Sequence, residues 1–142
     1  ADQLKKDANI RIIASSNQFS HEHNGHESWT NVPHERQKML NLFKTLNAEG
    51  VIFISGDVHY GEISCLKQDG LYPIYDITSS GLTQGWHNTS PNKNRLGTPV
   101  RKNNFGLIEI DWTEDPIIRL KICDKKGKTK GVYALMLSDL RL

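Results

Sequence analysis

Cysteine is scarce in this 142-residue sequence, with Cys65 and Cys123 as its two copies. Each lies in an apolar, strand-like run, where we expect a buried free thiol and not a disulfide framework. Long apolar runs are missing too: none approaches the ~18 residues that a membrane-spanning helix needs, so we expect no membrane span. Neither charge dominates, because 18 Lys and Arg face 16 Asp and Glu without forming a basic stripe. The sequence therefore gives no sign of a nucleic-acid partner.

An initiator methionine is also absent, since the chain opens Ala1-Asp2-Gln3-Leu4. We expect the natural N-terminus to lie outside this chain, through signal cleavage, through trimming, or because the chain is a piece of a longer enzyme. The length suits one domain with a sizeable core, which we place over residues 1–142. Nothing in the sequence fixes its cellular compartment.

A helix followed by a buried strand is the clearest structural pattern in the chain. Asn31 and Pro33 suit the start of a helix, and Gly50 suits its end. Between them, one face is apolar at helical spacing: Met39, Leu42, Phe43 and Leu46. The unbroken apolar run 51–54 then predicts a strand that is buried on both faces. An earlier β-branched run, 10–15, predicts another buried strand.

Strand patterns occupy much of the remaining chain, at residues 62–66, 71–79, 105–112, 117–123 and 132–137. Pro73 keeps at least the start of the second run irregular or at a sheet edge. The polar stretch 81–104 exceeds the length of ordinary structureless loops, so we expect it to be functional or mobile. Together, these elements predict an α/β fold with a mixed β-sheet, one main helix and a C-terminal antiparallel hairpin.

The stretch that is most informative about chemistry is Ser55-Gly56-Asp57-Val58-His59, directly after the buried strand. In α/β sheets, ligands bind beyond the carboxyl ends of the strands. Because Asp57 and His59 are two residues apart, a strand-like backbone would place both side chains on one side. A carboxylate oxygen and an imidazole nitrogen suit a transition metal, and Gly56 lets the backbone turn close to an ion. On these residues alone, a pair that merely caps a turn remains an open alternative.

Further motifs stand in a fixed order around this stretch. Residues 27–36 read E-x-W-x-x-x-P-x-E-R, and residues 50–59 read G-V-x-x-x-S-G-D-x-H. Residues 78–83 read TSSGLT, and Asn94-Arg95 and 104–106 follow before the closing hairpin. Over nearly the whole chain, these motifs resemble the C-terminal part of PhoD-like alkaline phosphatases. Their number and their order make the resemblance specific.

The resemblance implies the C-terminal half of a calcineurin-like metallophosphoesterase sandwich, with a multi-metal centre between the sheet ends. It implies an enzyme that hydrolyses small-molecule phosphate mono- or diesters through metal-activated hydroxide. The parent enzyme is expected to hold two or more divalent or trivalent ions, with Fe, Ca, Zn and Mn as candidates. By the motif match, His59 and Asp57 are the expected metal ligands and catalytic groups. Asp57 stands where the wider superfamily has the first histidine of Gly-His-x-His. Enzymes of this family are often exported.

Five other residues are expected near the substrate. Asn17 and Gln18 follow the first predicted strand, where the superfamily has a histidine ligand, so their amides are expected as substrate contacts or weak ligands. Ser79 and Ser80 end another strand and are expected to line the site without a catalytic role. Arg95 is expected either to contact the organic group of the ester or to anchor its loop.

A histidine-rich loop precedes the tryptophan motif, with His21, His23 and His26 close together. Such tracts can bind metal, although a solvated loop is the simpler interpretation. The superfamily's Gly-Asp-x-x-Asp and Gly-Asn-His-Glu/Asp ligand motifs do not occur in the sequence. One Asp–His pair cannot complete a catalytic metal centre. We therefore expect the remaining ligands in a missing N-terminal half, and no turnover by this chain alone.

Two other functions stay open on the sequence. A non-catalytic β-rich binding module would use residues 56–59 only as a turn, and a hydrolase of the same fold would act on another ester. Metal analysis separates the first from an enzyme, and a panel of substrates tests the second. Half of a sandwich would also expose apolar surface where its complement belongs, so we expect the chain to associate.

Overall fold

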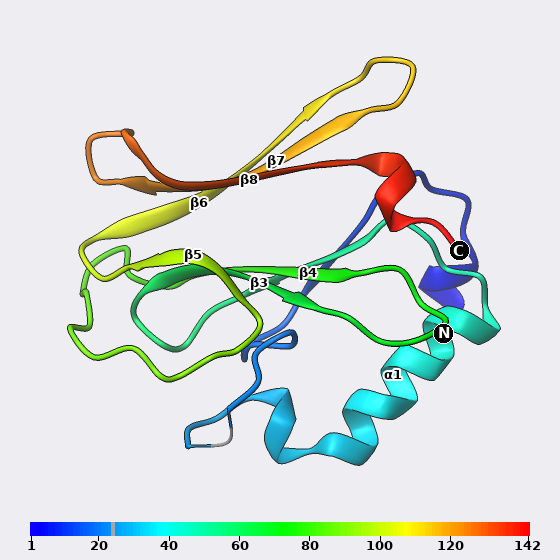
Figure 1. Ribbon diagram of the computed structural model, residues 1–142, viewed down its shortest axis with the longest axis horizontal. Coiled ribbons are helices and arrows are strands. Elements are labelled where there is room, and N and C mark those ends of the chain that lie inside the picture. The colour runs from blue at the N-terminus through cyan, green and yellow to red at the C-terminus, as the bar shows by residue number, and fades with distance from the viewer. Residues whose placement is uncertain (24) are drawn as a thin grey trace.

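Two β-sheets lie face to face, and one helix covers the far side of the larger sheet (Figure 1). The computed structural model describes residues 1–23 and 25–142. The strands are β1 (Arg11–Ala14), β2 (Val51–Ser55), β3 (Gly61–Leu66), β4 (Ile74–Ser79), β5 (Arg95–Val100), β6 (Asn104–Asp111), β7 (Ile117–Asp124) and β8 (Thr129–Met136). Helix α1 spans Pro33–Thr45, and short 3₁₀ helices span Asp2–Lys5, Trp29–Asn31 and Leu137–Leu140.

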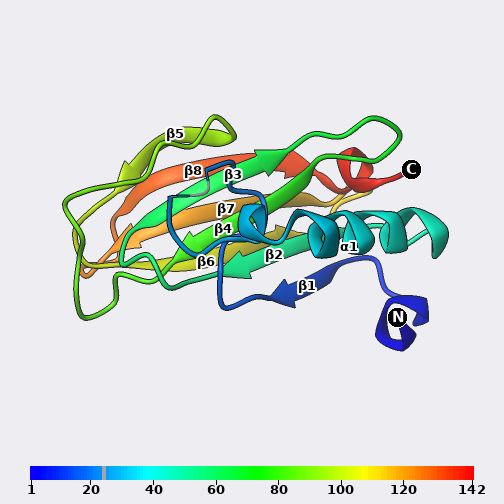
Figure 2. The ribbon, with the colours of Figure 1, turned by 90° about the horizontal axis from the view of Figure 1, so that it is seen from below.

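The larger sheet is mixed, as the sequence predicts, and has the strand order β1-β2-β4-β3-β5. Strands β1, β2 and β4 run parallel, whereas β3 is antiparallel to both of its neighbours. Helix α1 connects β1 to β2 and lies across one face of this sheet (Figure 2). The carboxyl ends of the three parallel strands therefore meet at one edge, which is where α/β proteins bind ligands.

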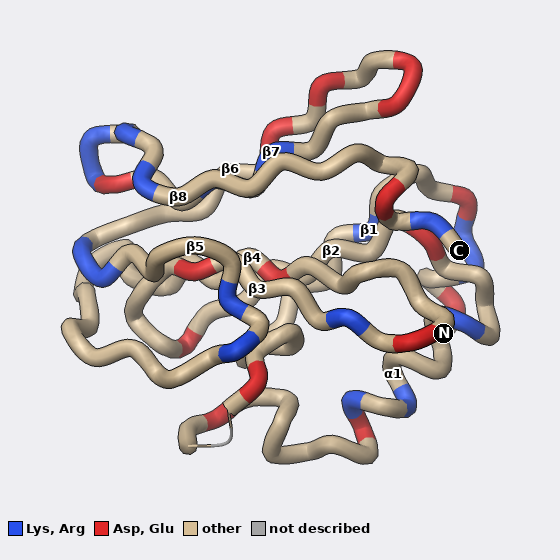
Figure 3. The backbone as a smooth tube through the Cα atoms, viewed as in Figure 1, with Lys and Arg blue, Asp and Glu red and all other residues tan. Residues whose placement is uncertain are grey.

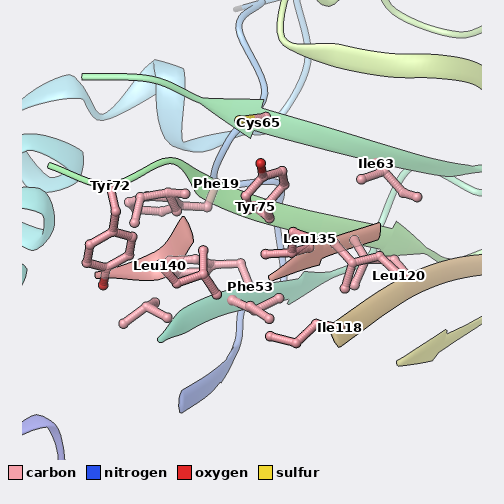
Figure 4. Packing of buried hydrophobic residues seen from close by; sticks show 14 of the residues in the cluster. Phe19, Phe53, Ile63, Cys65, Tyr72, Tyr75, Ile118, Leu120, Leu135 and Leu140 are labelled. Atoms are coloured by element: carbon pink, nitrogen blue, oxygen red, sulfur yellow. The ribbon is translucent and has the colours of Figure 1, made fainter. Parts of the chain in front are cut away.

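The smaller sheet is antiparallel and has the order β6-β7-β8. The predicted hairpin corresponds to β6 and β7, and the last predicted strand joins it as β8. One hydrophobic cluster contains side chains of both sheets, including Ile118 and Leu120 of β7 (Figure 4). The two layers thus share a core.

Strand β1 differs from its prediction as a buried strand. It lies at the edge of the larger sheet, and its residues alternate between half-buried and exposed. Ile12 has 51% of its surface exposed. A β-branched run indicates a strand, but it does not reveal whether a neighbour covers it. Among the described residues, no strand pairs with the outer edge of β1.

The predicted long loop 81–104 also needs correction, because it contains β5. This strand pairs antiparallel with β3, with a register shift between Gly61 and Ile63. Gly97 and Pro99 lie within β5, and both residues are uncommon in strand interiors. Their presence explains why no strand pattern is evident in this part of the sequence. The loop that remains between β4 and β5 has no regular secondary structure.

Helix α1 begins where Pro33 predicts, but its cap and its buried face differ. Its N-cap is Val32, since Asn31 belongs to the preceding 3₁₀ helix. The fully buried positions are Arg36, Leu40 and Phe43, and the rest of the predicted apolar face is half-buried. Beneath the helix, the rings of Phe53 and Phe19 stack with centroids 4.0 Å apart. Arg36 lies over the Phe19 ring and pairs with Glu22 at 3.2 Å.

Charged residues of both signs are spread along the backbone (Figure 3). The turn between β6 and β7 carries Glu114 and Asp115, whereas the turn between β7 and β8 carries Lys125, Lys126 and Lys128. No helix in the described part of the chain has the length and apolar character to cross a membrane.

Candidate functional site

The turn that carries Asp57 and His59 leaves the carboxyl end of β2 and leads into β3. Its backbone is not the strand-like one that the spacing suggests, because φ is 74° at Asp57 and 57° at His59. This left-handed conformation is uncommon outside glycine and costs on the order of 1–3 kcal/mol per residue. The strain therefore falls on the two predicted ligands and not on Gly56. Strained backbone of this kind clusters at functional sites.

Hydrogen bonds from the segment after β4 hold the turn in place. The His59 N–H donates to the Ser80 hydroxyl at 2.9 Å, and the His59 carbonyl accepts from the Trp86 N–H at 2.9 Å. Gly81 lies close beneath: a Cβ added there would be 2.2 Å from the Asn104 amide and 3.2 Å from the His59 carbonyl. A side chain at this position would displace the Asn104 amide and crowd the His59 carbonyl, which favours glycine. The TSSGLT segment supports the backbone of His59.

The imidazole of His59 has one nitrogen that is buried without a partner. Its ring lies edge-on to Trp86, with centroids 5.8 Å apart. Within the described residues, Nδ1 makes no hydrogen bond. A buried polar atom left unpaired costs about 1–3 kcal/mol. Asp57, two residues earlier, is exposed. The turn therefore offers an unsatisfied nitrogen and an accessible carboxylate.

A cavity of about 400 Å³ opens at this turn, a size that suits a small organic ligand. It is lined by His23, His26, Glu27, Asp57, Val58, His59, Tyr60, Trp86, Asn88, Thr89, Ser90 and Pro91. Three segments provide these residues: the turn after β2, the histidine-rich loop and the loop before β5. His23 and His26 of the histidine-rich loop thus line the same cavity as the predicted ligands, while His26 stays exposed, as expected for a solvated loop.

The residues at the turn fit one side of a metal site. An unpartnered imidazole nitrogen and a carboxylate are both suitable donors. However, no three His, Cys, Asp or Glu side chains within residues 1–23 and 25–142 are grouped so that they could hold an ion. Catalytic zinc, for comparison, takes three protein ligands. A complete centre would need further donors from another part of the protein.

A buried polar network lies on the α1 side of the larger sheet, and Asp76 of β4 is at one end of it. One Asp76 oxygen accepts from the N–H groups of Phe19 and Ser20, at 2.7 and 3.2 Å. The other accepts from the Ser55 hydroxyl at 2.7 Å. Burial raises the pKa of Asp76 above its ordinary value, against the effect of these hydrogen bonds. Through these hydrogen bonds, Asp76 on β4 connects the start of the histidine-rich loop, at Phe19 and Ser20, to Ser55 of β2.

Glu62 of β3 is the second carboxylate of this network, and its side chain is 0% exposed. Its Oε1 accepts from Gln18 at 2.6 Å and from Asn92 at 3.0 Å, and it lies 3.3 Å from Nδ1 of His21. Its Oε2 forms an ion pair with Nε of Arg95. Burial alone would raise the pKa of Glu62, but the hydrogen bonds from His21 and Arg95 outweigh it and lower this pKa.

Neither Asn17 nor Gln18 is among the residues that line the cavity. Gln18 is 2% exposed, and its amide donates to Glu62 and, at 3.1 Å, to Thr78. Asn17 is half-buried, and its side chain accepts from the Ser16 hydroxyl at 2.7 Å. Their role as substrate contacts stays a prediction, and the geometry of Gln18 favours a supporting role.

The other predicted residues, Ser79, Ser80 and Arg95, also contact protein groups. Ser80 accepts the hydrogen bond from His59, and Ser79 donates to Asn104 at 2.9 Å. Arg95 pairs with Glu62 and donates to the Ser90 carbonyl at 2.6 Å. Of the two expected roles of Arg95, these contacts favour the loop anchor.

Glu62, Asp76 and Asn92 were not singled out from the sequence. The two carboxylates carry a detectable signal, since each lies inside an otherwise apolar strand pattern, GEISCL and IYDITS. A charge within such a run is seldom buried without partners. Asn92 gives no such signal, because asparagine in a polar loop is ordinary.

Comparisons with known proteins give a similarity in fold. No family model matches the sequence, and no curated protein matches it significantly. The chain is similar to the solved structure of PhoD, with a TM-score of 0.65 and 14% sequence identity. The match covers 95% of this chain and 30% of the PhoD chain, so the chain spans about a third of the protein it resembles. The predicted resemblance to PhoD is confirmed at the level of the fold.

Proposed function

We propose that this chain is the C-terminal portion of the catalytic domain of a PhoD-like, metal-dependent phosphoesterase, built as half of a calcineurin-like sandwich. The observation that carries the proposal is the unpartnered Nδ1 of His59, held in a strained turn with the Asp57 carboxylate at the wall of a cavity. The fold similarity to PhoD supports it. The parent enzyme hydrolyses phosphate mono- or diesters.

In this proposal, His59 and Asp57 hold metal ions from one side, and the remaining ligands come from the rest of the parent enzyme. Bound ions of this type polarise phosphoryl oxygens and lower the pKa of water towards neutrality. The task of this chain is to present its two donors in a fixed geometry. The backbone bonds to Ser80 and Trp86 serve that task, and Trp86 covers one side of the imidazole.

An apolar groove supports the inference that further polypeptide covers the chain. A cavity of about 430 Å³ lies between the larger sheet and the edge strand β6, and its lining includes Ile12, Ile54, Ile77 and Ile108. Ile12 and Ile54 are 51% and 37% exposed. Within the described part of the chain, no strand pairs with the outer edge of β1 beside them, and exposed edges and apolar patches are features that proteins normally cover. The part of the parent that corresponds to the rest of PhoD is the occupant we propose.

Paramagnetic Mn²⁺ tests the ligand assignment, because it broadens NMR signals near even a weak site. We expect selective broadening of the amide signals of residues 57–60 in the ¹⁵N-labelled chain. The variants Asp57→Asn and His59→Ala should each reduce it. His34→Ala removes an exposed histidine of α1 and is the matched control. Broadening at 57–60 that persists without both donors would rule out the assignment.

Hydrolysis assays test the claim that the site is incomplete. We expect the purified chain to leave p-nitrophenyl phosphate and bis(p-nitrophenyl) phosphate intact in the presence of Fe, Ca, Zn or Mn ions. Robust turnover that His59→Ala abolishes would mean that the chain carries a complete centre by itself.

A further inference from the structure

The cavity at His59 has three walls, and none of them is a regular helix or strand. They are the turn 56–60, the histidine-rich loop (residues 17–23 and 25–28) and the loop 80–94. Segments of this kind keep a defined geometry only where buried contacts fix them. Two of these walls are hydrogen-bonded to the Glu62 side chain, and the third continues directly into the strand that carries Glu62.

On the first side, Glu62 fixes the base of the histidine-rich loop. Gln18 donates to it at 2.6 Å, and Nδ1 of His21 lies 3.3 Å from the same oxygen. Gln18 also donates to Thr78, which anchors this end of the loop to β4. Because His23 follows His21 by only two residues, the contact at His21 limits how far the cavity-lining part of the loop can move.

On the second side, Glu62 fixes the loop 80–94. Arg95 joins its Oε2 to the Ser90 carbonyl, and Ser90 lines the cavity. Asn92 donates to Oε1 at 3.0 Å and accepts from the Glu22 N–H at 3.1 Å. The two loops are therefore connected to each other through the same cluster.

On the third side, Glu62 belongs to the strand that continues the turn. Strand β3 begins at Gly61, directly after Tyr60, which lines the cavity. Only two residues, Tyr60 and Gly61, lie between His59 and Glu62 along the chain. A change in the position of Glu62 is thus transmitted to the turn through a short, continuous backbone.

From these contacts, we propose that Glu62 is a positioning residue that sets the geometry of the His59 site by joining the three walls of its cavity. The consequence for catalysis rests on the proposed function, whereas the joining of the walls does not. A carboxylate suits the task, because it accepts several hydrogen bonds and donates none. Its bonds with Arg95 are charge-assisted and stronger than neutral ones. Glutamine at this position would turn an N–H group towards one of the existing donors.

The variant Glu62→Gln tests the proposal through ¹⁹F NMR of the chain labelled with 5-fluorotryptophan. Trp29 follows the histidine-rich loop and donates its N–H to the Gln18 carbonyl, and Trp86 lies in the loop 80–94. Trp112 lies beyond β6 and serves as an internal reference. We expect the signals of Trp29 and Trp86 to shift and broaden in Glu62→Gln, and that of Trp112 to stay unchanged.

The control Glu109→Gln removes a carboxylate of the same type from a strand of the smaller sheet, where it pairs with Lys121 at 2.5 Å. It should leave Trp29 and Trp86 unchanged. Amide hydrogen exchange adds a second measurement: Glu62→Gln should accelerate exchange about tenfold or more in both loops, as expected for lost bonds to a charged group. Exchange in β6, β7 and β8 should stay the same. A merely structural role would accelerate exchange throughout the chain and would overturn the proposal.

The proposal would also be overturned if Glu62→Gln left the Trp29 and Trp86 signals and the amide exchange of both loops unchanged. Should this variant fail to fold, Arg95→Lys provides the test, since it keeps the cation but cannot join Glu62 to Ser90 in the same way. Arg95→Lys should shift the ¹⁹F signal of Trp86 and leave that of Trp29 unchanged. An unchanged Trp86 signal would contradict the proposal. None of these experiments requires a metal. If Mn²⁺ causes no broadening at residues 57–60 of the unmodified chain, that result contradicts the proposed function. It leaves the proposal for Glu62 unaffected.

Discussion

The backbone N–H of His59 donates a hydrogen bond to the hydroxyl of Ser80 at 2.9 Å. This bond joins the turn after β2 to the end of β4, two strands that are also neighbours in the larger sheet. Because His59 has a φ of 57°, its conformation depends on external contacts of this kind. This hydrogen bond gives the TSSGLT segment a physical role, namely to hold the backbone of His59.

Replacement of Ser80 by alanine should weaken Mn²⁺ binding at the turn. The hydrogen bond contributes about 0.5–1.5 kcal/mol, so the apparent affinity should fall about two- to thirteenfold. A Mn²⁺ titration followed by line broadening at residues 57–60 measures this affinity. Ser138→Ala removes a hydroxyl that bonds to Asp115 far from the turn, and it should have no effect on binding. Equal affinities in wild type and Ser80→Ala would show that the bond does not support the site.

The stability of the chain should fall at acid pH in a way that depends on Glu62. Its pKa lies below the ordinary 4.5 in the folded chain, so its stabilising contribution is present above pH 4.5 and is lost as the pH falls through the folded-state pKa. Glu62→Gln lacks this contribution. Asp76, whose pKa is raised by burial and, to a smaller extent, by the Glu62 charge, acts in the opposite direction, and Glu62→Gln removes only the smaller of these two causes.

Urea unfolding of wild type and Glu62→Gln over a range of pH measures this difference. We expect the gap in unfolding free energy to be largest near neutral pH and to narrow below pH 4.5. A gap that stays constant through the acid range would mean that the charge of Glu62 does not contribute to stability.

The stacked pair Phe19–Phe53 should be a main source of stability beneath α1. Phe53 has no exposed surface, so Phe53→Ala should lower the free energy of unfolding by about 3–5 kcal/mol. Phe105→Ala is the matched control, since Phe105 is 37% exposed on β6 and should cost much less. Thermal or urea unfolding compares them. Similar losses for both would indicate that the aromatic stack is not central to the core.

The apolar groove should cause the isolated chain to associate. Exposed Ile12 and Ile54 would be removed from water by self-association, and Ile12→Thr with Ile54→Thr should shift the sedimentation equilibrium towards monomer. Val132→Thr changes a residue on β8 that is at least as exposed and lies outside the groove, and it should leave association unchanged. A stable monomer of the unmodified chain at high concentration would contradict an uncovered interface.

Most of the fold could be predicted from the sequence, because the spacing of apolar residues is clearest in the elements that are most buried. Residues 51–53 form a buried strand next to a helix, although Ile54 at the end of the predicted run is 37% exposed, and the closing strands are where the pattern places them. The errors lie where burial depends on distant parts of the chain. Strand β1 has the composition of a core strand but lies at an open edge, and β5 contains Gly97 and Pro99 yet pairs with β3.

The candidate site could be predicted only in part. The position of Asp57 and His59 beyond β2 follows from the motif, but their left-handed backbone does not, because the sequence has no glycine at either position. The cluster around Glu62 joins residues that are far apart in the chain: 44 positions separate Gln18 from Glu62, and 70 separate Glu22 from Asn92. Such a network depends on tertiary packing, which local patterns do not encode.

Anomalous diffraction from crystals of the chain grown with Mn²⁺ shows directly whether an ion binds at His59. We expect a peak within bonding distance of an imidazole nitrogen of His59, on the side of the Asp57 carboxylate, in the cavity lined by Trp86. A map in which ions bind only at exposed histidines such as His34 or His87, with the His59 ring enclosed by Trp86 and out of reach of any ion, would contradict it.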